Sequence, residues 1–413
     1  MKKYLLLILV FSLSLEKLQS QILDFGEFNE DALKSEGFQK LKDYIGDTRI
    51  VIIGEQEHGI GSHYENFKLL SQFFHEDLGF NIIIQEYCFF EFYRVNEGLK
   101  VLPNAESYRK GMYWPQAKAK EYSAFFNYLN QESKGENPIQ MLGADPRIFP
   151  RNDFMAYLKK DLDSNIISIH EQARFLSILN ILFNQEYRDS TNTSLDKTFF
   201  FKTCKSLKYQ YQMSKGKETK WKVRFIHNLE VFAKNAWTRE FGDLNSPDRF
   251  FHREKGMADN IIWLAKEIFP NQKILIHLHN GHMAKNTDLL KFSLDSTQLK
   301  KLPNAGSILN EEFGDNCLHF ASSYYEGSYC KWDYKELKIP LPPSESIESK
   351  MNGLGINYGF YTLNENNQEL EKMFYGDFNT WIKNPEPRFP VNQLFDGIIF
   401  VNMVKMPMEM ENQ

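Results

Sequence analysis

The chain has 413 residues, of which 42% are hydrophobic and 25% charged, so it has ample apolar material for a large core. Its net charge is -5 at neutral pH, which argues against a nucleic-acid binder, because neutralising phosphates requires clustered Lys and Arg. The four cysteines, Cys88, Cys204, Cys317 and Cys330, show no zinc-finger or zinc-knuckle spacing. A bridge between Cys317 and Cys330 and free buried thiols are both compatible with this spacing.

The first twenty residues have the pattern of a targeting segment. Lys2 and Lys3 give a positive start, Tyr4 to Leu15 is apolar, and a polar stretch ends near Ser20. A membrane-spanning helix needs about 20 apolar residues, so this run is too short to be a typical span. We predict a cleaved signal peptide over residues 1–20 and export to the periplasm or the outside of the cell, with no membrane span in the mature protein. An uncleaved anchor is the alternative.

Residues 49–86 show a strand–helix–strand pattern. Residues 49–54, "RIVIIG", form a β-branched run that ends in glycine, as expected of a buried parallel strand. Apolar residues from Tyr64 to Phe74 then follow helical spacing, and Gly79 ends the predicted helix. Residues 81–86, "NIIIQE", predict a second strand, which completes a βαβ unit.

Apolar runs at residues 139–145, 273–283 and 396–402 predict further strands. Strands that alternate with helices predict an α/β fold with a mainly parallel central sheet flanked by helices. Between about residues 151 and 250, apolar residues recur every three or four positions instead. This stretch is predicted to be a helical insertion or subdomain within a domain that covers residues 21–413.

Polar side chains follow four of the predicted strands. They are Glu55 and His58 after the first strand, Glu86 after the second, Asp145 after the third, and His279 and His282 after the fourth. Ligands of parallel α/β sheets bind outside the carboxyl ends of the strands. The sequence therefore predicts that these side chains converge on one pocket.

These segments together resemble the erythromycin esterase family. The resemblance rests on "GEQEHG", "IIIQE", "MLGAD", "REKGMADNIIWL", "HLHNGHMAK", "SILNEEFGDN" and "FDGIIFV", which occur in family order over nearly the whole mature chain. The Gly-Glu-x-x-His-Gly loop together with the His-Asn-x-His segment is the specific combination. Hydrolases of this family open the lactone ring of macrolide antibiotics, and related sequences are expected to act on other esters.

The resemblance implies a role for each matching residue. His58 stands at the general base, which takes a proton from the water that attacks an ester carbonyl. Glu55, Glu86, His279 and His282 stand at the other catalytic positions. Within a residue of alignment, Lys68 stands where the family often has a cation, and we expect Lys68, Asp145 and Glu57 to contact the substrate.

Elementary chemistry agrees with these roles. A neutral imidazole suits a general base at neutral pH, and a neighbouring carboxylate orients it and stabilises the imidazolium that forms. The oxyanion of the tetrahedral intermediate then needs a cation or hydrogen-bond donor, for which His282, His279 and Lys68 are candidates. Direct attack by water is favoured, since the chain has no Gly-x-Ser-x-Gly elbow.

Two positions depart from the family pattern. Glu57 replaces a small or hydroxyl residue beside the base, and His277 adds a third histidine to the second motif. Both departures bear on the macrolide substrate more than on the hydrolytic groups. The remaining histidines are predicted to be surface or structural: His63, His75, His170, His227, His252 and His319.

Two other functions remain open at this point. A metal-dependent hydrolase would use Glu55, His58, Glu86 and His282 as ligands, and a bound metal would lower the pKa of water to about 7. A non-catalytic haem or metal carrier on a related scaffold is the second alternative. The favoured interpretation needs no cofactor and takes a small-molecule ester or lactone as its partner, while the oligomeric state is left open.

Overall fold

The computed structural model describes most of the chain after the predicted leader. The described residues are 21–102, 104–113, 115–162, 167–184, 194–214, 216, 218–240, 247–286, 303–331, 333–363 and 391–410. Among them, no helix is both long and apolar enough to cross a membrane. The predicted signal peptide lies outside the described residues and stays a prediction.

The chain divides into two compact units. The first unit comprises residues 1–84, 114–140 and 269–413, and the second comprises residues 85–113 and 141–268.

A nine-stranded sheet is the main β-structure, and its strand order is β1-β8-β9-β6-β2-β5-β3-β4, with β7 paired to β6. The strands are β1 (Ile22–Gly26), β2 (Ile50–Glu55), β3 (Ile82–Cys88), β4 (Gln140–Asp145), β5 (Ile274–His279), β6 (Cys317–Cys330), β7 (Glu336–Lys338), β8 (Tyr358–Thr362) and β9 (Gly397–Val404). The pairs β2–β5, β2–β6 and β6–β9 are parallel, whereas β8 runs antiparallel to β9 and β1 to β8. The predicted α/β class with a mainly parallel sheet is confirmed.

The central position of β2 in the sheet explains why its sequence is so apolar. Every residue from Ile50 to Glu55 is buried, and β5 and β6 flank β2 as parallel partners, as expected of a central strand that is covered on both faces. The register places Ile53 opposite His277, and Glu55 opposite His279. The two strands therefore end side by side, and their last residues come together at one edge of the sheet.

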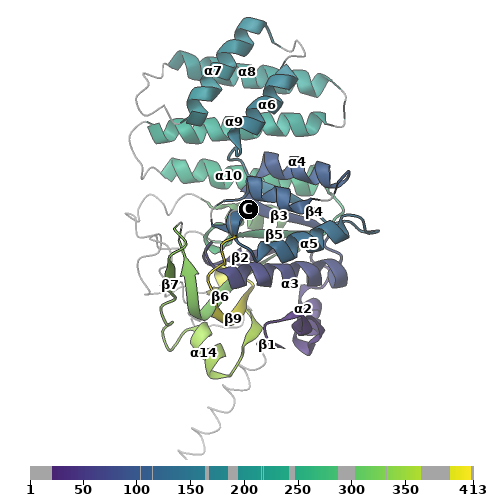
Figure 1. Ribbon diagram of the computed structural model, residues 1–413, viewed down its shortest axis with the longest axis vertical. Helices are drawn as coiled ribbons and strands as arrows, with labels where there is room; N and C mark the ends of the chain where they lie inside the picture. The colour runs from purple at the N-terminus through teal and green to yellow at the C-terminus, as the bar shows by residue number, and fades with distance from the viewer. Residues whose placement is uncertain are drawn as a thin grey trace, which may run out of the picture. The chain divides into compact units, whose positions relative to one another are not determined.

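The helices of the first unit include one that leads away from β2. They are α2 (Glu36–Ile45), α3 (Gly61–Leu78), α5 (Tyr122–Glu132), α11 (Asn280–Met283), α13 (Ala305–Phe313) and α14 (Ile347–Gly353). In Figure 1, α3 and α5 lie side by side, and their Phe67 and Phe125 rings meet edge to face at 5.2 Å. As predicted, α3 ends at Gly79, whose φ of 74° is left-handed and whose N–H donates to the His75 carbonyl.

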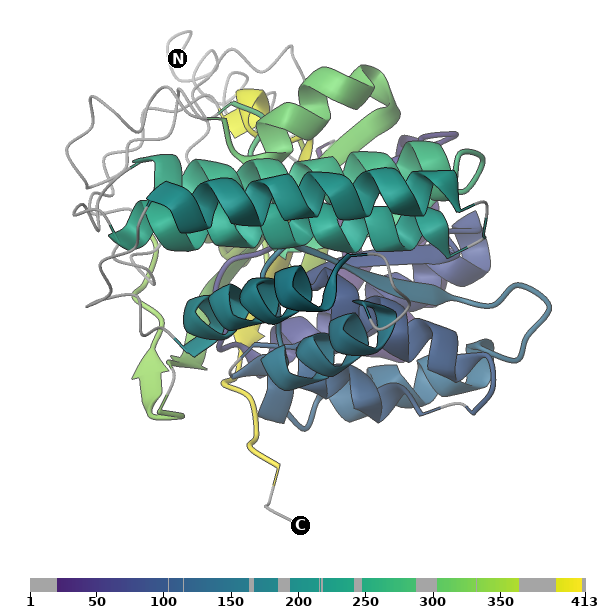
Figure 2. The same cartoon turned by 90° about the horizontal axis from the view of Figure 1, so that it is seen from above.

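The second unit is largely helical. Its helices are α4 (Phe89–Leu99), α6 (Arg151–Leu162), α7 (Ile169–Asn184), α8 (Ser194–Met213), α9 (Thr219–Glu240) and α10 (Pro247–Trp263), which continues as a π-helical turn over Leu264–Ile268. Figures 1 and 2 both show α8 and α9 side by side. Phe200 and Trp237 meet edge to face at 5.3 Å between them, and Lys208 pairs with Glu230 at 2.6 Å.

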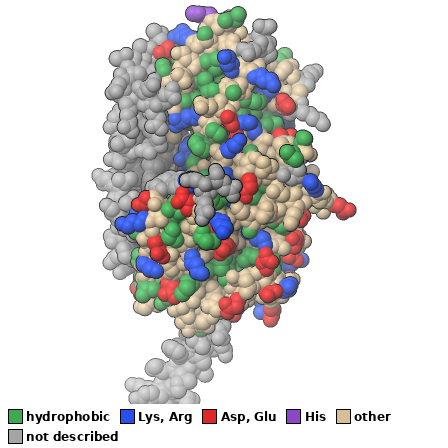
Figure 3. Space-filling model, viewed as in Figure 1, with side chains coloured by type: hydrophobic (Ala, Val, Ile, Leu, Met, Phe, Trp, Pro, Cys, Tyr) green, Lys and Arg blue, Asp and Glu red, His purple; other side chains and the backbone are tan. Residues whose placement is uncertain are grey.

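The surface and the cysteines agree with the composition. On the face in Figure 3, basic and acidic side chains of the described residues are interspersed, and no continuous basic surface forms among them.

All four cysteines are free and buried. Cys317 and Cys330 lie at opposite ends of β6, about 40 Å apart at roughly 3.3 Å per residue, which no disulfide can span.

Candidate active site

The site begins where β2 ends. Glu55 is the last residue of β2, and His58 follows it in the connection to α3. The Nδ1 atom of His58 lies 3.4 Å from Oε2 of Glu55, with side chains that are 29% and 4% exposed, respectively. A buried carboxylate thus faces an imidazole that solvent and small molecules can reach.

The backbone around His58 is held from three directions. The hydroxyl of buried Tyr64 donates to the carbonyl oxygen of His58. The N–H of Cys330 donates to the carbonyl of Gly59 at 2.9 Å, and Nε2 of His279 lies 2.9 Å from the carbonyl of Gln56. These contacts fix the loop, so His58 is held in place relative to Glu55.

His279 uses both ring nitrogens on the backbone. Its Nε2–H donates to the Gln56 carbonyl, and its Nδ1 accepts from the N–H of Gly281 at 3.1 Å, which fixes one neutral tautomer. The ring centroids of His279 and His58 are 5.2 Å apart, and those of His279 and His282 are 6.0 Å apart. His279 therefore positions the loop, while the partly exposed His282 extends the row of histidines beyond it.

Asn280 connects this row to the centre of the sheet. Its Nδ2 donates to the carbonyl of Ser322 at 2.8 Å, and its Oδ1 accepts from the N–H of Ser322 at 3.1 Å. The side chain also occupies the space beside Gly54, where a Cβ would come within 2.8 Å of the Met283 sulfur. Glycine is needed at position 54 so that Asn280 and Met283 can approach β2 this closely.

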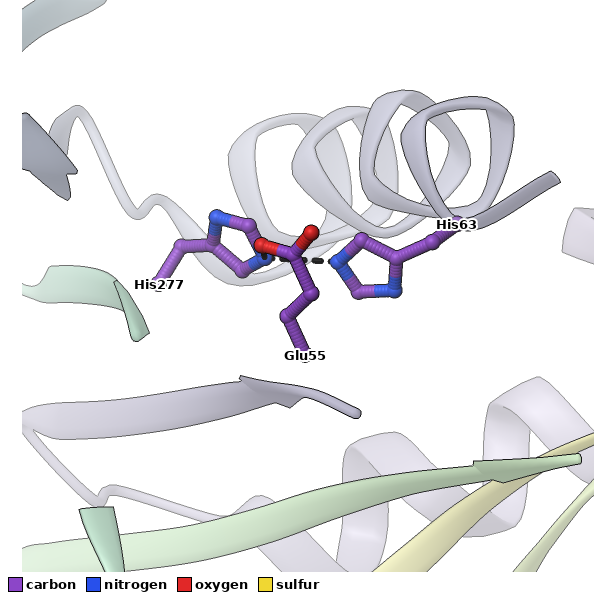
Figure 4. Close-up of side chains that lie close together, drawn as sticks. All are labelled: Glu55, His63 and His277. Carbon is purple, nitrogen blue, oxygen red and sulfur yellow. Dashed lines mark hydrogen bonds and ion pairs between the residues drawn. The ribbon is translucent and has the colours of Figure 1, made fainter. Parts of the chain in front are cut away.

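Two buried histidines, His63 and His277, form a pair beside Glu55 (Figure 4). Nε2 of His63 and Nε2 of His277 are 2.7 Å apart, and Nδ1 of His63 lies 2.7 Å from the hydroxyl of Tyr324. Figure 4 shows the Glu55 carboxylate beside this pair, and its Oε2 is 3.9 Å from Nε2 of His277. The prediction of His63 as a surface or structural residue is therefore too broad, because it is buried in contact with this site.

Glu55, His63 and His277 offer three donor atoms within 4.8 Å of one another, the donor set of many catalytic zinc sites. The two imidazoles are nearly coplanar, with an interplanar angle of 17° and centroids 4.9 Å apart. Their Nε2 atoms therefore face each other head-on. Two nitrogens on one tetrahedral zinc lie about 3.3 Å apart, with both lone pairs directed at the metal. This arrangement fits a hydrogen bond and does not fit a metal without movement of a ring.

Glu57, predicted to contact the substrate, is a buried carboxyl. Its Oε1 accepts the backbone N–H of His58 at 2.9 Å, and its Oε2 is buried without a hydrogen-bond partner among the described residues. Burial raises the pKa of Glu57 to about 7, and the neighbouring His58 opposes that rise. At neutral pH a neutral carboxylic acid is thus present in part beside the candidate base.

We expect Glu57→Gln to change how stability depends on pH. Between pH 4.5 and 7 the folded protein keeps a proton on Glu57 that the unfolded chain releases, so the wild type loses stability as pH rises through this window. The loss amounts to at most roughly 3 kcal/mol. Urea unfolding should therefore show that the wild type loses free energy of unfolding from pH 5 to pH 8 relative to Glu57→Gln. Exposed Glu336→Gln serves as the control, and an equal pH dependence in wild type and Glu57→Gln would disprove this account.

In the second unit, the predicted site residues Glu86 and Asp145 share one arginine. Nη2 of Arg253 lies 2.6 Å from Oε1 of Glu86 and 2.6 Å from Oδ2 of Asp145, and Nε of Arg253 donates to the same Oδ2 at 2.7 Å. Arg147 bonds Asp145 as well, through both its backbone N–H and its side chain. Two carboxylates and two guanidinium groups thus form one charge-balanced cluster.

This cluster keeps Asp145 ionised. Burial alone would raise the pKa of its fully buried carboxyl, but Arg147 and Arg253 outweigh that effect and lower it to about 2. The sequence motif "REKGMADN" contains Arg253, yet no role was predicted for it. Guanidinium groups bond the carboxylates of both Glu86 and Asp145, so the cluster holds these side chains in place within this unit. The catalytic role of Glu86 and the substrate contact of Asp145 stay predictions.

Lys68 has partners outside the histidine group. On α3, its Nζ lies 2.5 Å from Oε1 of Glu30, in the 3₁₀ turn Glu30–Lys34, and 3.0 Å from Oε1 of Gln72. Its contacts therefore tie α3 to the N-terminal segment. The prediction that it binds the substrate stays a prediction.

Comparison with known proteins identifies the family. The sequence matches the family model described as erythromycin esterase over residues 75–404. The chain belongs to the erythromycin esterase family. This membership makes it a hydrolase of that type, and it confirms the resemblance that the sequence motifs predicted.

Relatives of the chain span most of its length at low identity. Putative hydrolase YbfO of Bacillus subtilis (strain 168) is 25% identical over 337 residues, covering 75% of this chain and 73% of that protein. Erythromycin esterase type II of Escherichia coli is 22% identical over 379 residues, covering 81% and 85%. The family match begins after the loop that carries Glu55 and His58, so the placement of these two residues rests on their geometry and on the motif.

Solved structures show the same fold. A Bacillus cereus protein superposes with a TM-score of 0.72 at 16% identity, covering 96% of this chain and 98% of that one. A mutant of the erythromycin esterase EreC in its open conformation gives a TM-score of 0.62 at 13% identity, covering 90% and 95%. These likenesses confirm the erythromycin esterase fold.

The structure brings together part of the predicted esterase site. In the first unit, His58 lies within contact distance of Glu55, and His279 supports their loop beside His282. Glu86 and Asp145 lie together in the second unit, so convergence of all four strand ends on one pocket stays a prediction. Sequence reasoning missed the roles of His63 and Arg253.

Proposed function

We propose that this protein hydrolyses a carboxylic ester or lactone by direct attack of water, with His58 as the general base. One observation carries the proposal: the buried carboxylate of Glu55 faces Nδ1 of the partly exposed His58 at 3.4 Å. A carboxylate at Nδ1 favours the tautomer that keeps its proton there, which leaves the Nε2 lone pair for a water molecule. Membership in the erythromycin esterase family supports the same reaction class.

The proton and electron movements follow from this arrangement. Nε2 of His58 takes one proton as the water oxygen attacks the ester carbonyl, and Glu55 stabilises the resulting imidazolium. When the tetrahedral intermediate collapses, the same proton moves to the departing alkoxide. The products are a carboxylic acid and an alcohol, or a hydroxy acid when the substrate is a lactone.

The developing oxyanion needs a hydrogen-bond donor, and we assign this role to His282. Among the three predicted groups, His279 uses both nitrogens on the backbone and Lys68 is paired with Glu30. His282 lies next along the histidine row, on the short helix α11. A donor directed at the site where charge develops contributes a large share of catalysis in acyl transfer.

A panel of esters and lactones, macrolides included, tests the proposal. We expect purified protein to hydrolyse at least one member, with the same kcat/KM in the presence and absence of EDTA, because the proposed chemistry needs no metal ion. Erythromycin is one candidate substrate, since the Escherichia coli relative is named an erythromycin esterase. Loss of activity in EDTA and its return with a divalent ion would favour the metal-dependent alternative. Failure to hydrolyse any ester or lactone would count against the proposed function itself.

A further inference from the structure

The His63–His277 pair, with Tyr324 behind it, has the geometry of a shared proton. The two Nε2 atoms are 2.7 Å apart, and the near-coplanar rings have centroids 4.9 Å apart, so the nitrogen lone pairs lie almost on one line. Two neutral imidazoles facing each other in this way need one proton between them, because two bare lone pairs would repel and two protons would clash. One ring therefore donates and the other accepts.

The surroundings hold the pair in place and keep water out. The ring of His277 stacks on the ring of Phe67, with centroids 4.4 Å apart. Phe67 lies one helical turn after His63 on α3, and both histidines are almost fully buried. The Tyr324 hydroxyl lies 2.7 Å from Nδ1 of His63, and burial raises the pKa of Tyr324 well above its usual range. Tyr324 thus remains a phenol, and burial, with a further effect from His277, lowers the pKa of His63 well below its usual value.

The consequence for Glu55 does not depend on which histidine donates. Glu55 has an imidazole on either side, with His58 Nδ1 at 3.4 Å and His277 Nε2 at 3.9 Å from the same oxygen. If His63 donates, Nε2 of His277 has no proton. If His277 donates, its Nε2 proton is directed at His63. In both cases His277 Nε2 has no proton to offer Glu55, and Nδ1 of His58 is the imidazole nitrogen left to face this carboxylate, at 3.4 Å.

We propose that His63 and His277 are positioning residues that share one proton head-on and thereby direct the Glu55 carboxylate to Nδ1 of His58. This inference rests on the proposed role of His58 and deepens it. It also explains a histidine inside β5, at a buried position where strands of this kind carry an aliphatic side chain. His277 is there as the partner of His63, and the pair closes the site from below.

The experiment uses full-length protein labelled with ¹⁵N-histidine. We expect a scalar coupling between two imidazole nitrogens across the shared proton, absent from both His63→Leu and His277→Leu. Signals of the ten histidines are assigned with single His→Gln variants. The ¹⁵N shifts of His58 should show its Nδ1–H tautomer in the wild type and a mixture of tautomers in His63→Leu. Both readouts need no substrate, so they test the pair even if no ester is hydrolysed.

Activity then separates positioning from packing. His63→Leu should lower kcat by about 10- to 100-fold with little change in KM, as expected when a catalytic group is misplaced rather than lost. His63→Gln should retain most of the rate, since its side-chain amide can still donate to His277. The matched control is His75→Gln on the same helix, where His75 instead contacts Asn81 and Glu132, and this variant should behave as wild type.

Several results would overturn the inference. Absence of the nitrogen–nitrogen coupling in the wild type would show that His63 and His277 share no proton. If added Zn²⁺ instead shifted the ¹⁵N signals of both rings, Glu55, His63 and His277 would be assigned to a metal site. An unchanged His58 tautomer in a folded His63→Leu protein would refute the positioning role. Equal loss of rate in His63→Gln and His63→Leu, with equal loss of stability, would show that the pair serves packing alone.

Discussion

Replacement of His58 by glutamine is expected to lower kcat/KM for the best ester substrate by about 10²- to 10⁴-fold, the usual contribution of a general base. Glutamine keeps an N–H that can face Glu55, 3.4 Å away in the wild type, but it has no basic nitrogen to accept a proton from water. The loss should fall on kcat more than on KM, because proton transfer takes place in the transition state and not in substrate binding. Steady-state kinetics of the purified variant measures both.

The control for this variant is the exposed His170→Gln on α7, which should match wild type in rate. Circular dichroism and the unfolding midpoint show whether His58→Gln has folded. The backbone of His58 bonds Tyr64 through its carbonyl and Glu57 through its N–H, so the fold should tolerate a change of the His58 side chain. A folded His58→Gln protein with wild-type kcat/KM would exclude His58 as the base.

Replacement of Arg253 by methionine is expected to destabilise the protein by about 3–5 kcal/mol, the typical cost of removing one partner from a buried ion pair. Arg253 bonds Glu86 and Asp145 at 2.6 Å each, and Asp145 is fully buried. Methionine fills a similar volume but leaves two carboxylates with a single remaining guanidinium, that of Arg147. Urea unfolding followed by tryptophan fluorescence measures the change.

A neighbouring residue provides a matched control for this change. Lys255, two residues along α10, forms an exposed pair with Asp259 at 2.7 Å, and Lys255→Met should change stability by less than about 1 kcal/mol. A second variant, Asp145→Asn, should lose part of the stability, since its amide cannot balance two guanidinium groups. If Arg253→Met cost no more than Lys255→Met, the cluster would have no structural function.

Strands that contain a short run of aliphatic residues could be predicted from the sequence, and the strand without such a run could not. β2, β3, β4, β5 and β9 were predicted because parallel strands covered on both faces require such runs. The fourteen-residue β6 was missed, although it is the parallel neighbour of both β2 and β9. Its sequence contains Ser322 and Ser323, whose hydroxyls bond the Gly54 carbonyl and Glu348 inside the protein. Tertiary hydrogen bonds of this kind leave no pattern in the chain.

The candidate site divides in the same way. Glu55 and His58 were predicted because one ends β2 and the other follows it closely in sequence, and their contact is local. The His63–His277 contact joins residues more than 200 positions apart, and no spacing rule predicts it. One signal was available: His277 interrupts an aliphatic strand, and a buried histidine needs a hydrogen-bond partner. The arginine shared by Glu86 and Asp145 lies in α10, in a motif that spacing alone could not link to them.

Chemical rescue of His58→Ala by imidazole tests the general-base role most directly. The alanine variant leaves space beside the Glu55 carboxylate that an added imidazole can occupy, with one nitrogen toward Glu55 and the other toward water. We predict that ester hydrolysis by His58→Ala rises with imidazole concentration and follows the fraction of imidazole in its neutral form. His58→Ala protein that hydrolyses the ester as fast as wild type without imidazole would contradict the account, and so would a folded, inactive protein that imidazole leaves inactive.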